Sequence, residues 1–308
     1  MKSRVEVERV LEQAIRNSEV YKDEGKLADY IPELANVEPD NFGIALVNVD
    51  GEIIVKGDDE IVFSIQSISK IIDLIMALED VGKEEVFSKV GMEPTEYKFN
   101  SNRPISDKAA NPLINAGAIS TCSLIRGTST QEKFDRVIEK IKALSNSEDV
   151  RFLEHIFLSE METTDINRSI SYYLKSIGII DNDAEEVLEL YVRNCSIGLN
   201  VKQLAHISAV LANGGRSLDG KQQLVDKEVV KITLALMAAC GMYEESGQYL
   251  VEVGFPSKSG VGGAIIGIVP GKCGICTYSP RLDRSGNSVR GLKVLEEISK
   301  TLDLNIFI

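Results

Sequence analysis

Hydrophobic residues recur with a helical period near both ends of the chain. Over residues 4–18 the apolar positions fall on one side of a helix, and they are Val7, Val10, Leu11, Ala14 and Ile15. A second stretch, roughly residues 288–302, also has a helical pattern. One-sided apolar stripes are typical of helices that cover a core, so we predict a helix near each terminus.

Strand-like patterns lie next to these helices. Residues 42–57 predict a hairpin, because two apolar runs flank Asp50-Gly51, a strong turn signal. Near the other end, three apolar stretches separated by turn residues predict strands at residues 249–253, 264–269 and 273–279. We expect strands from both ends of the chain to form one sheet.

The middle of the chain is mostly helical in pattern, most clearly at residues 184–193 and 201–212. Residues 95–115 are irregular and polar, and we expect them to form a loop that reaches a functional site. The predicted fold class is α/β (α+β): a mixed antiparallel sheet, flanked by terminal helices, with a large helical insert. We expect one domain over residues 1–308, with a sheet subdomain from 1–74 and 240–308 and a helical subdomain from 75–239.

Composition narrows the possible functions. The chain has 308 residues, 44% hydrophobic and 26% charged, with a net charge of −13. Such acidity argues against nucleic-acid binding and against an anionic membrane surface. The sequence lacks an apolar run of about 18 residues, and its charged start lacks the apolar core of a signal peptide. We therefore expect a cytoplasmic protein without a membrane or nucleic-acid partner.

The cysteines and histidines do not suggest a metal site. The five cysteines, at positions 122, 195, 240, 273 and 276, are scattered and odd in number, which indicates free thiols. Cys273 and Cys276 have C-x-x-C spacing but lie in a predicted strand, where residues three apart point to opposite faces. His155 and His206 are far apart in sequence, so we expect neither a structural zinc nor a cofactor.

Two short motifs carry nucleophile chemistry. Ser67-Ile68-Ser69-Lys70 places a hydroxyl and an amine three residues apart, which on a helix puts them on one face. A serine hydroxyl becomes a good nucleophile when a nearby base takes its proton, and a partly desolvated lysine can be that base. Lys258-Ser259-Gly260 would line a cleft if it lies on an edge strand. Together, S-x-x-K and K-[ST]-G resemble the fingerprint of penicillin-binding proteins and β-lactamases.

Longer runs resemble one family on that fold, the serine-dependent β-lactamase-like glutaminases of bacteria. The similar runs cover residues 25–34, 63–70, 111–119, 172–178, 241–247, 258–263 and 278–283, with Ser159-Glu160, Asn167 and residues 286–291 between or after them. The resemblance extends from about residue 25 to 295. It implies a β-lactamase/penicillin-binding-protein-like fold and hydrolysis of the side-chain amide of L-glutamine to L-glutamate and ammonia.

The resemblance also implies roles for named residues. Ser67 matches the nucleophile and Lys70 the activating lysine, while the backbone N–H groups of Ser67 and Val261 match the oxyanion donors. Tyr243 matches a tyrosine that relays a proton. Lys70 and Lys258 would lower the pKa of Tyr243, since an adjacent positive charge favours the ionised phenol.

The substrate-binding set implied by the resemblance is larger. Glu160 is the carboxylate among the residues implied for holding free glutamine, so it should face the substrate ammonium. The segment from Glu160 to Asn167 lacks the Gly-Asp-Arg-Asn associated with the family but keeps the spacing of these two residues. The full set is Tyr30, Gln66, Ser67, Asn115, Glu160, Asn167, Tyr191, Tyr243, Lys258, Ser259 and Val261.

Two alternatives stay open. The first is another Ser/Lys acyl hydrolase of the same fold, an esterase or a β-lactam hydrolase, which gives no reason for Glu160, Asn115 and Asn167 to occur together. The second is a non-catalytic binding protein, which we would expect to lack Ser67, Lys70 or Tyr243. The resemblance further implies a homodimer or homotetramer, although no interface is visible in the sequence.

Overall fold

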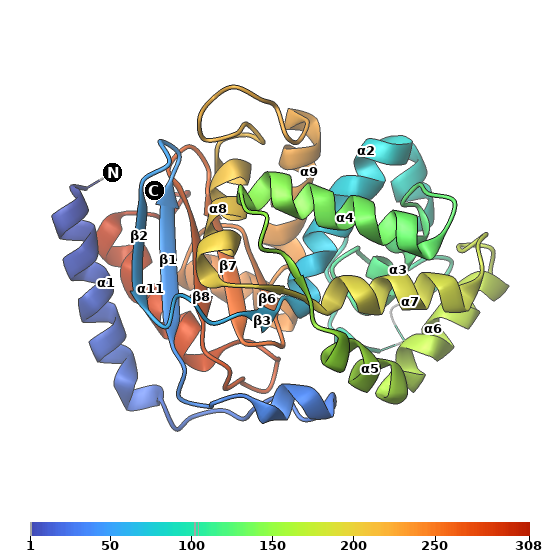
Figure 1. The fold of residues 1–308 in the computed structure, drawn as a ribbon, viewed down its shortest axis with the longest axis horizontal. Coiled ribbons are helices and arrows are strands. Elements are labelled where there is room, and N and C mark those ends of the chain that lie inside the picture. The colour runs from blue at the N-terminus through green and yellow to red at the C-terminus, as the bar shows by residue number, and fades with distance from the viewer. Residues whose placement is uncertain (1, 102, 104) are drawn as a thin grey trace.

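The structure, a computed structural model, describes residues 2–101, 103 and 105–308. It contains an antiparallel sheet with two long helices along one face and a large helical part at one end (Figure 1). Asn102 and Pro104, within the predicted loop 95–115, lie outside the described residues, as does Met1. This arrangement confirms the predicted fold class.

The main sheet joins both ends of the chain. Its strand order is β2-β1-β8-β7-β6, and every neighbouring pair is antiparallel. The predicted hairpin turns at Gly51, whose φ of 87° suits glycine. Its first strand pairs with the last strand of the chain, with Ala45 opposite Cys276. The strands are β1 (Gly43–Asn48), β2 (Ile53–Gly57), β6 (Ser257–Gly260), β7 (Ala264–Val269) and β8 (Cys273–Tyr278).

The strand predicted at residues 249–253 is wrong. This stretch belongs to helix α10 (Ser246–Glu252). The hydroxyl of Ser246 accepts a hydrogen bond from the backbone N–H of Met242, and the Tyr249 hydroxyl lies 2.6 Å from Ser257 Oγ on β6. These contacts hold the segment as a helix beside the sheet edge, so tertiary packing overrides the β-branched composition.

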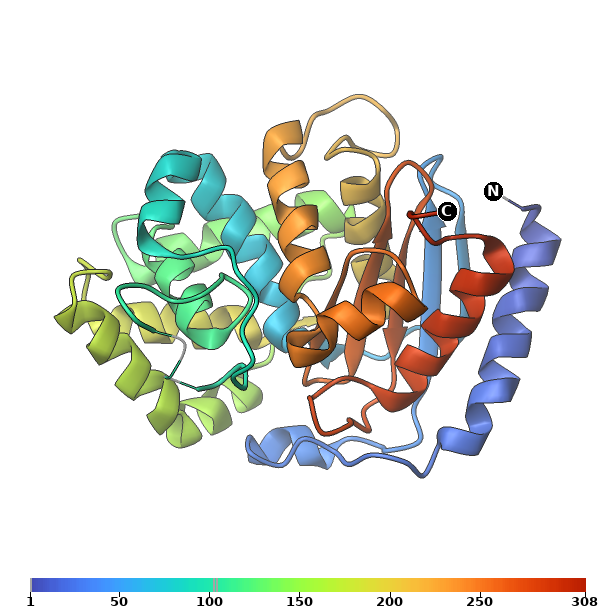
Figure 2. The same cartoon turned by 180° about the vertical axis from the view of Figure 1, so that it is seen from behind.

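The terminal helices α1 (Arg4–Ser18) and α11 (Val289–Leu302) confirm the sequence prediction. They lie side by side over one face of the sheet (Figure 2). Cys273 belongs to the core beneath them, whereas Cys276 belongs to the core on the other face. The two thiols therefore point to opposite faces, as strand geometry requires, and both are free.

Helix α8 (Val201–Ala212) covers the other face of the sheet (Figure 1). The close approach depends on Gly274 of β8, because a Cβ atom there would lie 2.1 Å from the backbone nitrogen of Ala209. An Asn200–Gln203 capping box starts the helix. Although α8 falls inside the predicted helical subdomain, it packs on the sheet; the subdomain boundaries stay a prediction.

The remaining helices form the part beyond the sheet. They surround α2, whose first turns are buried on all sides. The helices are α2 (Ser69–Lys89), α3 (Asn115–Ser123), α4 (Thr130–Ser145), α5 (Glu154–Thr163), α6 (Asp165–Ser176), α7 (Ala184–Cys195) and α9 (Lys227–Cys240). A small sheet of order β3-β5-β4 joins the two parts, through β3 (Phe63–Ser64), β5 (Ile197–Leu199) and β4 (Arg151–Phe152).

Short 3₁₀ helices complete the described structure. They are η1 (Glu19–Tyr21), η2 (Pro32–Asn36), η3 (Gln66–Ile68) and η4 (Tyr243–Glu245). Two of them hold predicted site residues, because η3 contains Gln66 and Ser67 and η4 begins with Tyr243. These predicted site residues therefore lie where the small sheet, the edge of the main sheet and the helical part meet.

Candidate active site

The S-x-x-K motif lies at the junction between β3 and α2. Ser67 is in η3 and Lys70 in the first turn of α2, and they are only 5% and 0% exposed. Gln66 has a φ of +47°, a left-handed conformation that is unfavourable for a residue with a Cβ. Such strain collects at functional sites, where the surrounding structure holds the backbone. The turn thus places the serine at the start of a buried helix.

Lys70 is held by the loop that leads into α3. Its Nζ donates hydrogen bonds to Asn115 Oδ1 at 2.6 Å and to the carbonyl oxygen of Leu113 at 3.4 Å. Burial lowers the pKa of Lys70 to about 8, although nearby Cys195 and Asp73 oppose the shift. A lysine with this pKa is partly unprotonated near neutral pH, so it can accept a proton.

The K-[ST]-G motif forms the end of the edge strand β6. Lys258 and Ser259 are fully buried. A Cβ at Gly260 would lie 2.6 Å from the carbonyl oxygen of Ile65 and 3.5 Å from the backbone nitrogen of Ser67. The missing side chain therefore lets the strand end lie against the turn that carries the nucleophile. Val261, the next residue, is also buried.

Tyr243 enters the same site from η4, with a left-handed φ of +55°. Its hydroxyl donates to the carbonyl oxygen of Ser259 at 3.3 Å. Lys258 Nζ lies 4.2 Å from the centre of the Tyr243 ring and donates to the same carbonyl oxygen. The ring of Phe99, from the predicted loop 95–115, packs at 4.7 Å between centroids, so this loop does reach the site.

The expected lowering of the Tyr243 pKa is wrong. Burial raises the pKa of Tyr243 to about 12, and hydrogen bonding with Ser67 and Ser259 offsets only part of this effect. Burial and the neighbouring Lys70 also hold the pKa of Lys258 well below its usual range. Tyr243 therefore keeps its proton at neutral pH.

Five of the predicted substrate-binding residues come from four helices and a 3₁₀ turn. Asn115 at the start of α3 donates through Nδ2 to Asn167 Oδ1 on α6, at 2.9 Å. Gln66 Nε2 donates to Glu160 Oε2 on α5 at 3.4 Å. On α7, the ring of Tyr191 lies 6.0 Å from Lys70 Nζ. Residues separated by as many as 125 positions therefore line one site.

Glu160 is the acidic residue of this cluster. It is 5% exposed, and burial raises its pKa to about 7, while Gln66 and Lys70 partly oppose the shift. The side chain of Tyr30, before η2, is half-exposed, but desolvation around its hydroxyl and the nearby Glu160 carboxylate raise the pKa of this phenol. A buried carboxylate whose hydrogen-bond donor is a neutral amide is costly to ionise, so the site is suited to a ligand that brings a positive charge.

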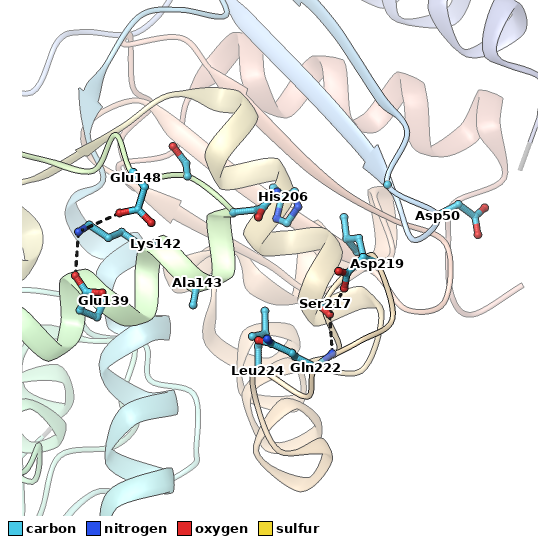
Figure 3. Close-up of a pocket in the computed structure, with 14 residues that line it drawn as sticks. Asp50, Glu139, Lys142, Ala143, Glu148, His206, Ser217, Asp219, Gln222 and Leu224 are labelled. Atoms are coloured by element: carbon cyan, nitrogen blue, oxygen red, sulfur yellow. Dashed lines mark hydrogen bonds and ion pairs between the residues drawn. The ribbon is translucent and has the colours of Figure 1, made fainter.

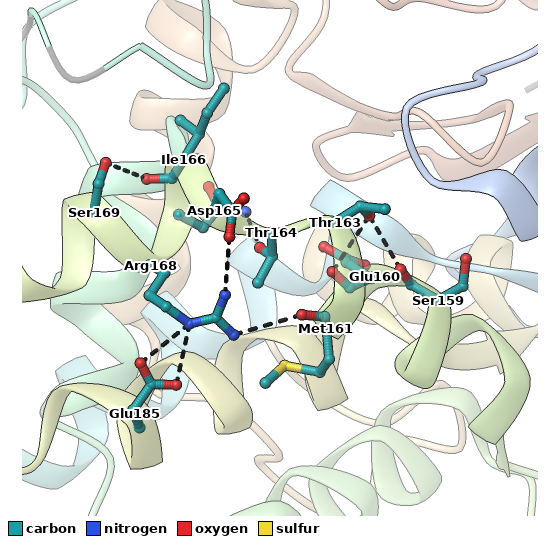
Figure 4. A network of polar contacts seen from close by, with 11 residues as sticks. Ser159, Glu160, Met161, Thr163, Thr164, Asp165, Ile166, Arg168, Ser169 and Glu185 are labelled. Atoms are coloured by element: carbon teal, nitrogen blue, oxygen red, sulfur yellow. Dashed lines mark hydrogen bonds and ion pairs between the residues drawn. The ribbon is translucent and has the colours of Figure 1, made fainter.

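Arg168, which sequence reasoning missed, ties the corner between α5 and α6 (Figure 4). It donates through Nε to Glu185 on α7 at 3.1 Å and through Nη2 to the carbonyl oxygen of Met161 at 3.5 Å. The corner presents Glu160 on one helix and Asn167 on the next. In the sequence, the position of Arg168 directly after Asn167 could have indicated this role. A charged residue on a helix, however, is usually solvated and therefore draws no attention.

A wide surface cavity lies elsewhere, between α4, α8 and the turn of the β1–β2 hairpin (Figure 3). It contains none of the predicted site residues. Lys142 there pairs with Glu139 at 2.9 Å and Glu148 at 3.4 Å, so its cation is already neutralised. A smaller cavity reaches Tyr243 and Phe99 from the side of loop 95–115. Of these two cavities, the smaller one is lined by a predicted site residue, Tyr243.

Within the described residues, no helix is both long and apolar enough to cross a membrane. In the same part of the chain, no three His, Cys, Asp or Glu side chains are grouped as metal ligands.

Comparison with known proteins identifies the family. Residues 25–307 match the profile of the family described as Glutaminase. A glutaminase of Natranaerobius thermophilus is 46% identical over 301 residues, covering 97% of each chain. The solved structure of a probable glutaminase, ybaS, superimposes with a TM-score of 0.95 at 38% identity, covering 99% of each chain. A probable glutaminase from Bacillus subtilis, solved with 6-diazo-5-oxo-L-norleucine, gives a TM-score of 0.92 at 34% identity, covering 100% of this chain and 98% of that one. The chain therefore belongs to the glutaminase family of amidohydrolases and has its β-lactamase-like fold.

Proposed function

We propose that this chain hydrolyses the side-chain amide of L-glutamine to L-glutamate and ammonia, with Ser67 as nucleophile and Lys70 as its base. The observation that carries the proposal is the buried pairing of the S-x-x-K turn with Glu160 in one site. Ser67 and Lys70 supply the acyl-transfer chemistry, and Glu160 supplies the charge that free glutamine needs.

The first half of the reaction forms an ester. The Lys70 amine takes the proton of Ser67 Oγ while this oxygen attacks the amide carbon of the substrate. The tetrahedral oxyanion accepts hydrogen bonds from the backbone N–H groups of Ser67 and Val261, each worth about 3–4 kcal/mol of barrier. The C–N bond then breaks, its nitrogen takes a proton, and ammonia leaves. The protonated phenol of Tyr243 is the donor for that step, and it regains a proton from Lys70.

The second half releases the product. Water attacks the ester carbon and gives up a proton to the Lys70 amine. The ester C–O bond then breaks, Ser67 Oγ regains a proton, and L-glutamate leaves with the free enzyme restored. Lys258 and Ser259 position Tyr243, since the carbonyl oxygen of Ser259 accepts hydrogen bonds from both the Tyr243 hydroxyl and Lys258 Nζ.

Substrate selection rests on the polar cluster opposite the motif. Glu160 pairs with the α-ammonium, while Asn115, Asn167 and the phenols of Tyr30 and Tyr191 hold the carboxylate and orient the chain. A simple ester or a β-lactam without an ammonium would leave the Glu160 carboxylate buried without a positively charged partner. This cost disfavours an esterase or β-lactam hydrolase.

A labelling experiment tests the nucleophile directly. The wild type should gain one adduct with 6-diazo-5-oxo-L-norleucine, mapped by mass spectrometry to the peptide that contains Ser67, and should release ammonia from glutamine. Folded Ser67→Ala should gain no adduct and should lose turnover, and Lys70→Ala should lose nearly as much. Adduct formation or wild-type-like turnover in Ser67→Ala would refute the mechanism. Glutamine should also be hydrolysed far faster than asparagine or a chromogenic β-lactam.

The assembly and location are also part of the proposal. The outer face of α6 exposes apolar side chains, which suits a contact between copies of this chain in a homodimer or homotetramer. They are Ile166, Tyr172, Tyr173 and Ile177. Light scattering at micromolar concentration should give a multiple of 33.8 kDa, and the monomer mass would contradict the assembly. We also propose a cytoplasmic location, and the acidic composition disfavours binding to nucleic acid or to an anionic membrane.

A further inference from the structure

A second buried carboxylate lies one turn further along α2 from Lys70. Asp73 follows Lys70 by three residues on α2, and both side chains are 0% exposed. Helix residues three apart lie on the same face, about 5–6 Å apart at Cβ. Among the described residues, neither side chain has an ion-pair partner within 4.0 Å, and the charge of each shifts the pKa of the other through space. An ionised Asp73 and a charged Lys70 therefore act on each other through a dry, low-dielectric interior.

The hydrogen bonding of Asp73 is incomplete. Asn194 Nδ2 on α7 donates to Asp73 Oδ1 at 2.7 Å. In the described part of the structure, Asp73 Oδ2 and Asn194 Oδ1 have no hydrogen-bond partner apart from the weak thiol donor of Cys122 beside Asp73. Unpaired buried acceptors are costly and rare. A proton on the carboxyl converts one of these acceptors into a donor, so this pair of side chains is built to hold a proton for part of the time.

Few other charged groups lie around Asp73. Cys122 on α3 and Cys195 on α7 face the same interior, and burial raises the pKa of each thiol well above its usual range. Both thiols therefore stay neutral during turnover. Glu160 acts on Lys70 from the substrate side. Burial raises the pKa of Asp73 itself to about 7, with Cys122, Asn194 and Lys70 opposing the shift. Asp73 therefore changes charge in the range where Lys70 begins to lose its proton.

We propose that Asp73 is a positioning residue that sets the charge state of Lys70 from the next turn of α2. An ionised Asp73 holds the proton on the Lys70 ammonium, and a neutral Asp73 frees the amine to take the proton of Ser67. The proposal rests on the proposed function, in which Lys70 is the base. Removing the negative charge should let Lys70 lose its proton at lower pH, with a shift of about one pH unit or more.

The test is the pH dependence of kcat at saturating glutamine, where bound substrate occupies Glu160 and the profile reports groups in the complex. In Asp73→Asn, the rising alkaline limb should move to lower pH by about one unit. The matched control is Asp80→Asn, which makes the same chemical change on the same helix. Asp80 lies away from the site and pairs with Arg136 at a distance of 2.7 Å. The control should keep the wild-type limb. A limb in Asp73→Asn that superimposes on that of the wild type would overturn the proposal.

A second variant covers the case in which Asp73→Asn does not fold. Asn194→Leu removes the donor that favours the ionised carboxyl, so Asp73 keeps its proton to higher pH and the limb should again move to lower pH. An unmoved limb in this variant would also contradict the role of Asp73. Lys70→Ala separates the two proposals: retained turnover in that variant refutes the proposed function itself, whereas lost turnover with an unmoved Asp73→Asn limb refutes only the role of Asp73.

Discussion

Glutamine binding should weaken about tenfold when the pH falls from 8 to 6. Burial raises the pKa of Glu160 to about 7, so the carboxylate fraction in the free enzyme drops from about nine-tenths at pH 8 to about one-tenth at pH 6. Only the ionised form pairs with the substrate ammonium. Apparent affinity falls in proportion to the competent fraction, so KM should rise by about this ratio.

Glu160→Gln separates this effect from other titrations. The neutral amide cannot supply the charge, so KM should rise by about tenfold to a hundredfold at pH 8, as expected for the loss of a charged hydrogen bond of about 1.5–3 kcal/mol. The variant should also lose the dependence of KM on pH between 6 and 8. Ammonia release across a range of glutamine concentrations measures both quantities. N-acetyl-glutamine, which lacks the ammonium, should be a poor substrate for the wild type.

The same substitution should stabilise the free enzyme. The folded pKa of Glu160 lies above the unfolded value of 4.5, so the native state binds the proton more tightly and loses stability as pH rises from about 4.5 to 7. The full shift corresponds to about 3 kcal/mol above pH 7. Glu160→Gln should therefore raise Tm at pH 8 but change it little at pH 4. The reasoning fails if KM of the wild type is constant between pH 6 and 8, or if N-acetyl-glutamine is hydrolysed efficiently.

Three further substitutions test residues that line or support the site. Tyr243→Phe should lower kcat by about a hundredfold or more in steady-state kinetics with little change in KM, because it removes only a proton donor; an unchanged kcat would leave Tyr243 as a wall of the pocket. Arg168→Ala should lower the free energy of unfolding by about 1 kcal/mol or less in a urea titration. It should also raise KM, because the corner that carries the ammonium-binding carboxylate loosens; an unchanged KM would contradict that role. Gly260→Ala should cost about a hundredfold in kcat, because its Cβ would lie 2.6 Å from the carbonyl oxygen of Ile65, whereas Gly247→Ala, with open space around it, should keep wild-type activity.

The local sequence determined those features that depend on neighbouring residues. The period of apolar positions determined α1, α8 and α11, because each helix buries one stripe or face on the sheet. Asp50-Gly51 determined the first hairpin, since the turn needs a residue that tolerates positive φ. The S-x-x-K spacing indicated that Ser67 and Lys70 would lie together, because a helix repeats its faces every three to four residues.

Only the tertiary structure decided what depends on distant residues and on burial. The segment at residues 249–253 is a helix because of contacts with β6 and η4, which its own composition does not reveal. The pKa of Tyr243 moves upward instead of downward because burial removes water from the phenolate, an effect that depends on the whole packed site. Asp73 could have been noticed from its spacing to Lys70, but its importance depends on full burial and on Asn194, which lies 121 positions further along the chain. Chemistry-bearing residues can be recognised along a sequence, whereas their charge states are set by the low-dielectric interior that folding creates.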